Sequence, residues 1–177
     1  MDKEETLEEI NRRICNPVSN INSLSGFEII AESITEKIYS IFGRNSLLSM
    51  LYQVGSGPGQ QIASRIKEKY QKEEFSIIES IEILMKELSN YYSIQIKEIG
   101  NDDNKIRIII ENHCFLRAPI KHREKLNYGK AFCRINKGYF ETAFRSLLGN
   151  KVRKVGINYL GNDEYKDVCI EELIFHL

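Results

Sequence analysis

The chain has 177 residues, of which 42% are hydrophobic, and this suits one domain with a substantial buried core. Lys and Arg together number 25, as do Asp and Glu, so the zero net charge gives no general attraction to nucleic acid or anionic membranes. No apolar run approaches the roughly 20 residues of a membrane span, and the acidic start is unlike a signal peptide. We therefore expect a cytoplasmic protein with no membrane partner and no direct nucleic-acid binding.

The first half of the sequence is predicted to be helical. Apolar residues at helical spacing indicate a helix over residues 3–15, and the Asn- and Ser-rich stretch up to residue 26 indicates a linker. Further helices are predicted over residues 27–42, from 45 or 46 to about 52, from about 58 to 70, and over 75–91. Gly55–Gly59 lacks the Gly-Lys-Ser/Thr ending of a phosphate-binding loop, so we interpret it as a tight turn between two helices.

From residue 93 the pattern becomes that of a sheet. Residues 93–99 alternate as a strand does, a polar turn follows, and residues 105–114 return as the second strand of a hairpin. A helix is predicted over about 130–148, ended by Gly149. Strands over 151–160 and 165–175 form a second hairpin.

This order of elements predicts an α+β fold in which N-terminal helices precede a four-stranded antiparallel sheet (hairpin, helix, hairpin) covered by helices. We assign residues 1–26 to an N-terminal helix and linker, and residues 27–177 to one α+β domain. Its helical part is 27–92 and its sheet-containing part is 93–177. Surplus apolar faces on the helices predict a homodimer interface.

Three of the four cysteines surround the predicted helix 130–148. Cys114 ends a strand, on the same side as the isoleucines expected to be buried, Cys133 opens the helix, and Cys169 lies in the last strand. A helix N-terminus favours the thiolate form of a cysteine. Three thiolates and one imidazole would satisfy a structural zinc ion, which takes four tetrahedral ligands. We choose His122 as the fourth ligand, because it lies in the long loop between Cys114 and Cys133.

Other interpretations of these residues stay open. His113 and, more weakly, His176 are alternatives to His122, although adjacent strand residues such as His113 and Cys114 point to opposite faces. No Cys-x-x-Cys pair is present, so three buried core cysteines without a metal are the competing interpretation. A Cys–His dyad at Cys133 is a further alternative, without a recognisable oxyanion-stabilising loop.

The stretch from about Ile106 to Phe175 carries an ordered set of features. Cys114-Phe115 follows an apolar strand, Cys133 stands four residues before Lys137-Gly138-Tyr139, Gly149 ends the helix, and Gly161-Asn162-Asp163 precedes Cys169. In these features the chain resembles the 4-vinyl reductase domain family, small-molecule (hydrocarbon) binding domains related in fold to small subunits of the transport protein particle. The resemblance implies a mixed fold, commonly dimeric through its N-terminal helices, with a buried apolar pocket and, in many members, a zinc ion beside it.

The resemblance also implies particular site residues. In aromatic-sensing members, Cys133 and Cys169 would match two zinc ligands. The other two positions fall near Gly156 and Tyr159, which are not usual zinc ligands, so Cys114 and a histidine would have to substitute. The pocket would be lined by aromatic residues of the central helix and nearby strands, namely Phe132, Tyr139, Phe140, Phe144 and Tyr159. The competing interpretation is that these are ordinary core residues.

We therefore predict a cytoplasmic binding or sensory module for a small hydrophobic molecule, held together by structural zinc. One alternative is an enzyme or assembly factor in tetrapyrrole vinyl reduction, but the sequence has no nicotinamide or flavin motif. The other alternative is a scaffold or interaction protein that binds no small ligand.

Overall fold

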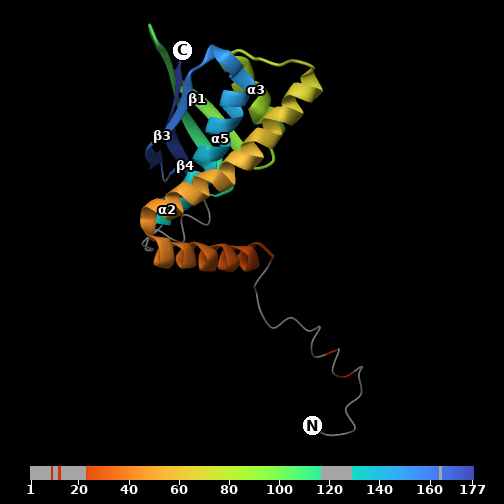
Figure 1. Cartoon of the computed structure of the whole chain (residues 1–177), viewed down its shortest axis with the longest axis vertical. Coiled ribbons are helices and arrows are strands. Elements are labelled where there is room, and N and C mark those ends of the chain that lie inside the picture. Colours follow the sequence, from red (N-terminus) through yellow and green to blue (C-terminus); the bar gives the residue numbers. More distant parts are fainter. Residues whose placement is uncertain (1–8, 10–11, 13–22, 117–128, 164) are drawn as a thin grey trace. The chain divides into compact units, whose positions relative to one another are not determined.

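A computed structural model describes residues 9, 12, 23–116, 129–163 and 165–177 of the chain (Figure 1). The chain divides into two compact units, Met1–Lys37 and Ile38–Leu177. Nearly all of the predicted helix 3–15, most of the linker after it and the loop 117–128 lie outside the described residues. The predicted domain boundary at residue 26 therefore stays a prediction.

Helices fill the first half of the described chain and strands the second half, with one helix between two hairpins, as predicted. In chain order the elements are α2 (Ser23–Tyr70), α3 (Ile77–Glu87), β1 (Tyr92–Asp102), β2 (Lys105–Cys114), a 3₁₀ turn (Gly129–Phe132), α5 (Cys133–Leu148), a second 3₁₀ turn (Gly149–Lys151), β3 (Lys154–Asp163) and β4 (Val168–His176).

The long helix α2 contains one break, at Gly43. This residue has φ 76° and ψ 176°, a backbone conformation that glycine adopts readily and other residues do not. The break falls where the sequence predicts the end of one helix and the start of the next. The helix then continues through Pro58 to Tyr70, so the predicted turn at Gly55–Gly59 is wrong.

The glycines of this segment allow α2 and α5 to pack closely. A Cβ on Gly59 would lie 2.3 Å from the carbonyl oxygen of Tyr139, and one on Gly138 would lie 2.1 Å from that of Tyr52. Gly55 is as tightly placed, since its Cβ would lie 1.9 Å from a carbonyl oxygen of α5. Because these glycines have no side chain, the backbones of α2 and α5 can approach each other closely.

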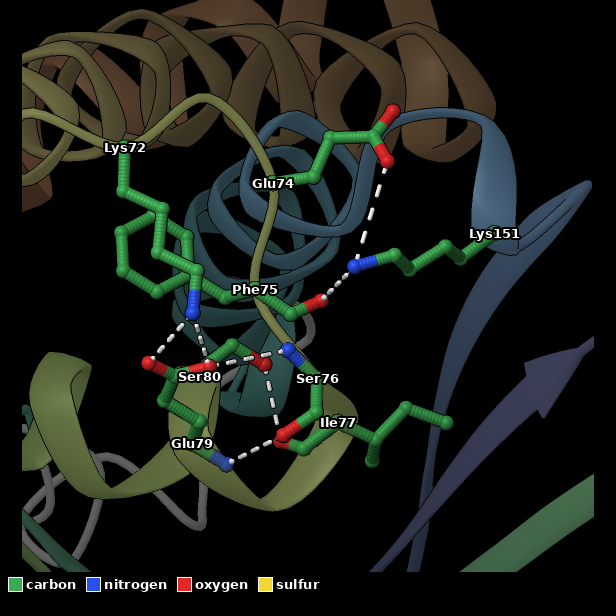
Figure 2. A network of polar contacts seen from close by, with 8 residues as sticks. All are labelled: Lys72, Glu74, Phe75, Ser76, Ile77, Glu79, Ser80 and Lys151. Atoms are coloured by element: carbon green, nitrogen blue, oxygen red, sulfur yellow. Dashed lines mark hydrogen bonds and ion pairs between the residues drawn. The ribbon is translucent and has the colours of Figure 1, made fainter.

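The segment that links α2 to α3 is fixed to the C-terminal end of α5. A capping box begins α3, in which the Ser76 hydroxyl accepts from the Glu79 amide at 3.3 Å and the Glu79 carboxylate accepts from the Ser76 amide at 3.2 Å. Figure 2 shows this cap between Lys72, which pairs with Glu79 at 2.7 Å, and Lys151, which donates to the Phe75 carbonyl at 3.2 Å. The Phe75 amide in turn donates to a carbonyl in the last turn of α5 at 2.9 Å.

The four strands form one antiparallel sheet in the order β1-β2-β4-β3, so the two hairpins pair through β2 and β4. The helix α5 packs against β3 and α3, and α3 packs against β1, so the two helices share one face of the sheet (Figure 1). This confirms the predicted α+β fold with a four-stranded antiparallel sheet covered by helices. Among the described residues, no helix has both the length and the apolar character needed to cross a bilayer.

The covered face of the sheet changes in character along its strands. On β2, Ile108 and Ile110 are buried in the core, and the next two positions on the same side, Asn112 and Cys114, are buried as well. The residues of β4 that pair with the first three of these are Leu173, Glu171 and Cys169. One end of the covered face is therefore apolar, and the other end carries polar groups and thiols.

Candidate functional site

Three thiols lie where the covered face of the sheet becomes polar. Cys114 is buried at the end of β2, Cys133 is the first residue of α5, and Cys169 lies in β4; none of the three forms a disulfide. Burial raises the pKa of the Cys114 thiol to about 12, and the charges of Cys169 and Cys133 act in the same direction. Cys169 and Cys133 are thus near enough for their charges to act on the Cys114 thiol. Zinc binds thiolates, so Cys114 would have to lose its proton on binding.

The predicted fourth zinc ligand, His122, lies outside the described residues. His113 is exposed on the other face of the sheet, where its Nδ1 lies 3.1 Å from the Asp167 carbonyl oxygen. His176 is at the opposite end of β4 from Cys169. In the described part of the chain, no three or more His, Cys, Asp or Glu side chains are placed to hold a metal ion. The three cysteines are all described residues, so the zinc site stays a prediction that needs their side chains to come closer together as well as a contribution from His122.

An open cleft lies between the start of α5 and the strands β3 and β4. Its volume is about 490 Å³, which is within the range of small-molecule sites. The hydroxyl of Tyr159, a predicted pocket residue, donates to Asn162 Oδ1 at 2.6 Å beside this cleft. The cleft is lined by Cys133, Arg134, Lys137, Ile157, Asn158, Tyr159 and Glu171.

A small cavity lies deeper, between the sheet and the helices α3 and α5. Its volume is about 10 Å³, which is room for about one water molecule. It is lined by Met85, Ile94, Ile110, Phe140, Phe144, Ile157, Glu171 and Leu173. Two predicted pocket residues, Phe140 and Phe144, are therefore at this cavity, and a ligand with an aromatic ring would enter only if neighbouring side chains moved.

Two further predicted pocket residues are Tyr139, which is part of the aromatic packing, and Phe132, which lies directly before α5. Phe132 is buried, and Tyr139 is partly buried against the core. The Tyr139 and Phe140 rings meet edge-on at 5.6 Å, and Tyr92 meets Phe140 at 4.9 Å between centroids. Burial raises the pKa of both tyrosines.

Glu171 lines both the open cleft and the interior cavity, and it is the one polar side chain among the described residues that line the cavity. The residue is 7% exposed, and its Oε2 accepts from Asn112 Nδ2 at 2.8 Å. Burial raises the pKa of the Glu171 carboxyl, and the hydrogen bond from Asn112 partly opposes this shift. Glu171 was not among the residues predicted from the sequence. Its alternation with Leu173 and Phe175 on β4 is a signal that could have placed it on the covered face.

Two buried amide oxygens lack a hydrogen-bond partner within the described residues. They are Oδ1 of Asn112, a residue 1% exposed, and Oδ1 of Asn136, a residue 5% exposed in the first turn of α5. Buried polar atoms are nearly always paired, so each of these acceptors marks a position where a donor is expected. Neither residue was predicted, because a lone Asn in a strand or helix gives no sign of burial.

Two residues of α5 fix the wall of the cleft by holding the backbone of β3. Lys137 Nζ donates to the Ile157 carbonyl at 2.7 Å, and the Ile157 amide donates to Glu141 Oε1 at 2.8 Å. The hydroxyl of Tyr52, on α2, donates to the other oxygen of Glu141 at 2.9 Å. Because β3 is at the edge of the sheet, these bonds satisfy backbone groups that no further strand pairs with.

The fold is similar to that in the crystal structure of the phenol-responsive sensory domain of the transcription activator PoxR with phenol. The TM-score is 0.59, and the match covers 84% of this chain and 74% of that chain at 11% sequence identity. At this identity the similarity shows the fold alone. No protein-family model matches the sequence, and no curated protein matches it.

Proposed function

We propose that this chain is a binding or sensory module for a small, mainly apolar molecule, as the resemblance to the 4-vinyl reductase domain family implies. The proposal is supported by a fold shared with a phenol-responsive sensory domain. The observation that carries it is the position of Glu171, which lines both an open cleft and the apolar cavity behind it. A ligand that entered by the cleft would reach a space with apolar walls and a polar anchor, as small-molecule sites generally have.

The cavity would enlarge as its walls moved. Met85 is a partly buried, flexible side chain, and Ile94 is only partly buried on β1. Their displacement outward would open space beside Phe140 and Phe144 without disturbing the fully buried residues of the core. No specific observation in the described residues favours the two alternatives, an enzyme or assembly factor in tetrapyrrole vinyl reduction and a scaffold protein that binds no small ligand.

Ile94→Phe tests the proposal by filling the cavity from a partly buried position. Titration calorimetry of the full chain with toluene is expected to show saturable binding. Ile94→Phe should weaken that binding at least about tenfold, because the ring occupies space that the ligand needs. The matched control is Ile99→Phe, at an exposed position of the same strand, which should bind as the unchanged chain does. Equal binding by both variants would contradict the proposed site.

We also propose a structural zinc ion bound by Cys114, Cys133, Cys169 and His122. The support is the resemblance, which implies Cys133 and Cys169 as zinc ligands, and the effect that the charges of both residues have on the Cys114 thiol. Binding would require the three side chains to come closer together. Native mass spectrometry should show one zinc per chain, removed by a strong chelator and absent from Cys133→Ser. If the chain carries no metal after purification in zinc-containing buffer, this proposal is wrong.

A further inference from the structure

We infer that Asn112 and Glu171 form the polar end of the ligand pocket and select an uncharged, mainly apolar molecule that donates a hydrogen bond through a hydroxyl or amino group. This inference rests on the proposed function, because it names the ligand class of the same site. It predicts weaker binding of plain hydrocarbons and exclusion of carboxylates.

The first support is the unequal pairing of the two polar atoms of the Asn112 side chain. Nδ2 donates to Glu171 Oε2 at 2.8 Å, and this bond fixes the orientation of the amide group. Oδ1 is buried and has no partner within the described residues. An unpaired buried acceptor is unfavourable, and a ligand that donates to it removes this penalty. A hydrocarbon of the same shape cannot do so.

The second support is the location of this pair beside the apolar cavity. On β2, Ile110 is the neighbour of Asn112 on the same side of the strand, and on β1 the residue paired with Asn112 is Ile94. Both isoleucines line the cavity, and so does Glu171. The unsatisfied group of this pair is the Asn112 oxygen, which is an acceptor, so the ligand must supply the donor.

The third support concerns charge. A carboxylate ligand would have to leave its charge beside the apolar walls of the cavity, and its acceptor oxygens could not pair with the Asn112 oxygen. A cationic ligand would have to pass Arg134 and Lys137, which line the cleft outside Glu171. Both signs of charge are thus disfavoured, and a neutral hydroxyl or amino group is the chemistry that fits.

The test compares the binding of four probes of similar size to the full chain by titration calorimetry: toluene, phenol, aniline and benzoate. Phenol and aniline are expected to bind at least about tenfold more tightly than toluene, because one hydrogen bond to an otherwise unpaired buried acceptor gives a ratio of that order. Benzoate is expected to bind more weakly than toluene.

Single substitutions show which side chains cause the difference in affinity between the probes. Asn112→Leu replaces the acceptor by an apolar group of similar size and should bring the phenol-to-toluene ratio close to one while toluene still binds. Glu171→Gln keeps an acceptor for Asn112 Nδ2, so it should retain the phenol preference and reduce the discrimination against benzoate. The matched control is Glu172→Gln, on the opposite face of the sheet, which should change neither ratio. If circular dichroism shows that Asn112→Leu does not fold, the inference is tested by the affinities of Glu171→Gln for phenol and benzoate relative to toluene.

The outcomes separate the two proposals. Failure of toluene, phenol and aniline alike to bind the unchanged chain would contradict the proposed function and this inference with it. Equal binding of phenol and toluene would leave the proposed function standing and overturn the inference. Tight benzoate binding, or a phenol preference that survives in folded Asn112→Leu, would overturn it as well.

Discussion

Two adjacent glutamates of β4 lie on opposite faces of the sheet and have different partners, although they are similarly little exposed, at 7% for Glu171 and 6% for Glu172. Glu171 is buried beside Asn112, and burial raises its pKa. Glu172 accepts hydrogen bonds from Asn158 and Arg107 on the outer face, and these bonds lower its pKa. The pKa values of these two adjacent residues are thus shifted in opposite directions, upward for Glu171 and downward for Glu172.

The pH dependence of stability should differ in sign between these two residues. The raised pKa of Glu171 means that the folded chain retains a proton that the unfolded chain releases at lower pH. The stability from this group is present below the unfolded pKa and is lost as the pH rises through the folded pKa. Glu171→Gln should therefore raise the free energy of unfolding at neutral pH relative to the unchanged chain and remove this part of the pH dependence.

Glu172→Gln is the matched comparison. The lowered pKa of Glu172 gives stability that is present above the unfolded pKa and is lost as the pH falls through the folded pKa. This variant should therefore lose free energy of unfolding at neutral pH and little at strongly acidic pH. Urea unfolding across the acidic and neutral range measures both variants. Effects of the same sign in the two variants would contradict the assigned environments.

At this scale the sequence supplied part of the candidate site. It predicted that Cys114 lies on the same side as Ile106, Ile108 and Ile110. Ile106 is partly buried, and the other three residues are buried. It did not identify Asn112 or Glu171, because their importance comes from pairing across two strands that are 59 residues apart in the chain. The contribution of His122 stays a prediction.

At the scale of elements, the crossing of α2 and α5 depends on glycine. Gly55→Ala should lower the free energy of unfolding by about 1–3 kcal/mol, since the new Cβ would collide with the α5 backbone and force the helices apart. Gly57→Ala is the control in the same helix. No atom lies within 4 Å of its Cβ position, so alanine should stabilise the chain by about 0.5–1 kcal/mol through helix propensity.

Urea unfolding of the two glycine variants tests whether α2 and α5 are in close contact at Gly55. A Gly55→Ala variant as stable as Gly57→Ala would show that the helices do not approach as closely as described. Because both changes add the same methyl group to the same helix, the difference between them removes the propensity term and leaves the packing term.

The pattern of elements could be predicted well because it depends on local periodicity. Alternation indicated both hairpins, and helical spacing indicated α3 and α5, with bounds within a few residues of those observed. The error at Gly55–Gly59 has a physical cause. Glycine and proline near each other usually mark a turn. Here the glycines are needed because the backbone of α5, which is distant in sequence, lies too close for a side chain.

At the scale of the whole molecule, we propose a homodimer formed through the N-terminal part of α2, as the resemblance implies. In the unit that ends at Lys37, the side chains of Phe27, Ile29, Ile30 and Ile34 are all more than half exposed. Several large apolar side chains close together on one helix are typical of an interface. Sedimentation equilibrium should therefore show a dimer of the full chain.

Ile30→Asp tests this interface. A charge in the centre of an apolar contact should weaken dimerisation at least about tenfold. Glu28→Lys, which reverses a charge on the other side of the same helix, should leave the dissociation constant almost unchanged. A chain that is monomeric at micromolar concentrations would contradict the proposed dimer, as would equal effects of the two substitutions.

The function was less predictable than the fold. Periodicity and turn chemistry predict a covered four-stranded sheet, but they do not tell a pocket-lining aromatic from a core aromatic. Phe140 and Phe144 illustrate this, since they pack against each other and also line the cavity. Whether that cavity opens depends on how the side chains around it rearrange, and this is a property of the assembled interior.

The most direct test of the central claim is methyl NMR of the full chain titrated with phenol. If a small molecule enters behind Glu171, the methyl resonances of Ile94, Ile110 and Met85 will shift together and saturate at one ligand per chain. The resonance of Ile109, on the opposite face of the sheet from Ile110, will stay in place. Unchanged cavity methyls at phenol concentrations that shift only exposed groups would contradict the account.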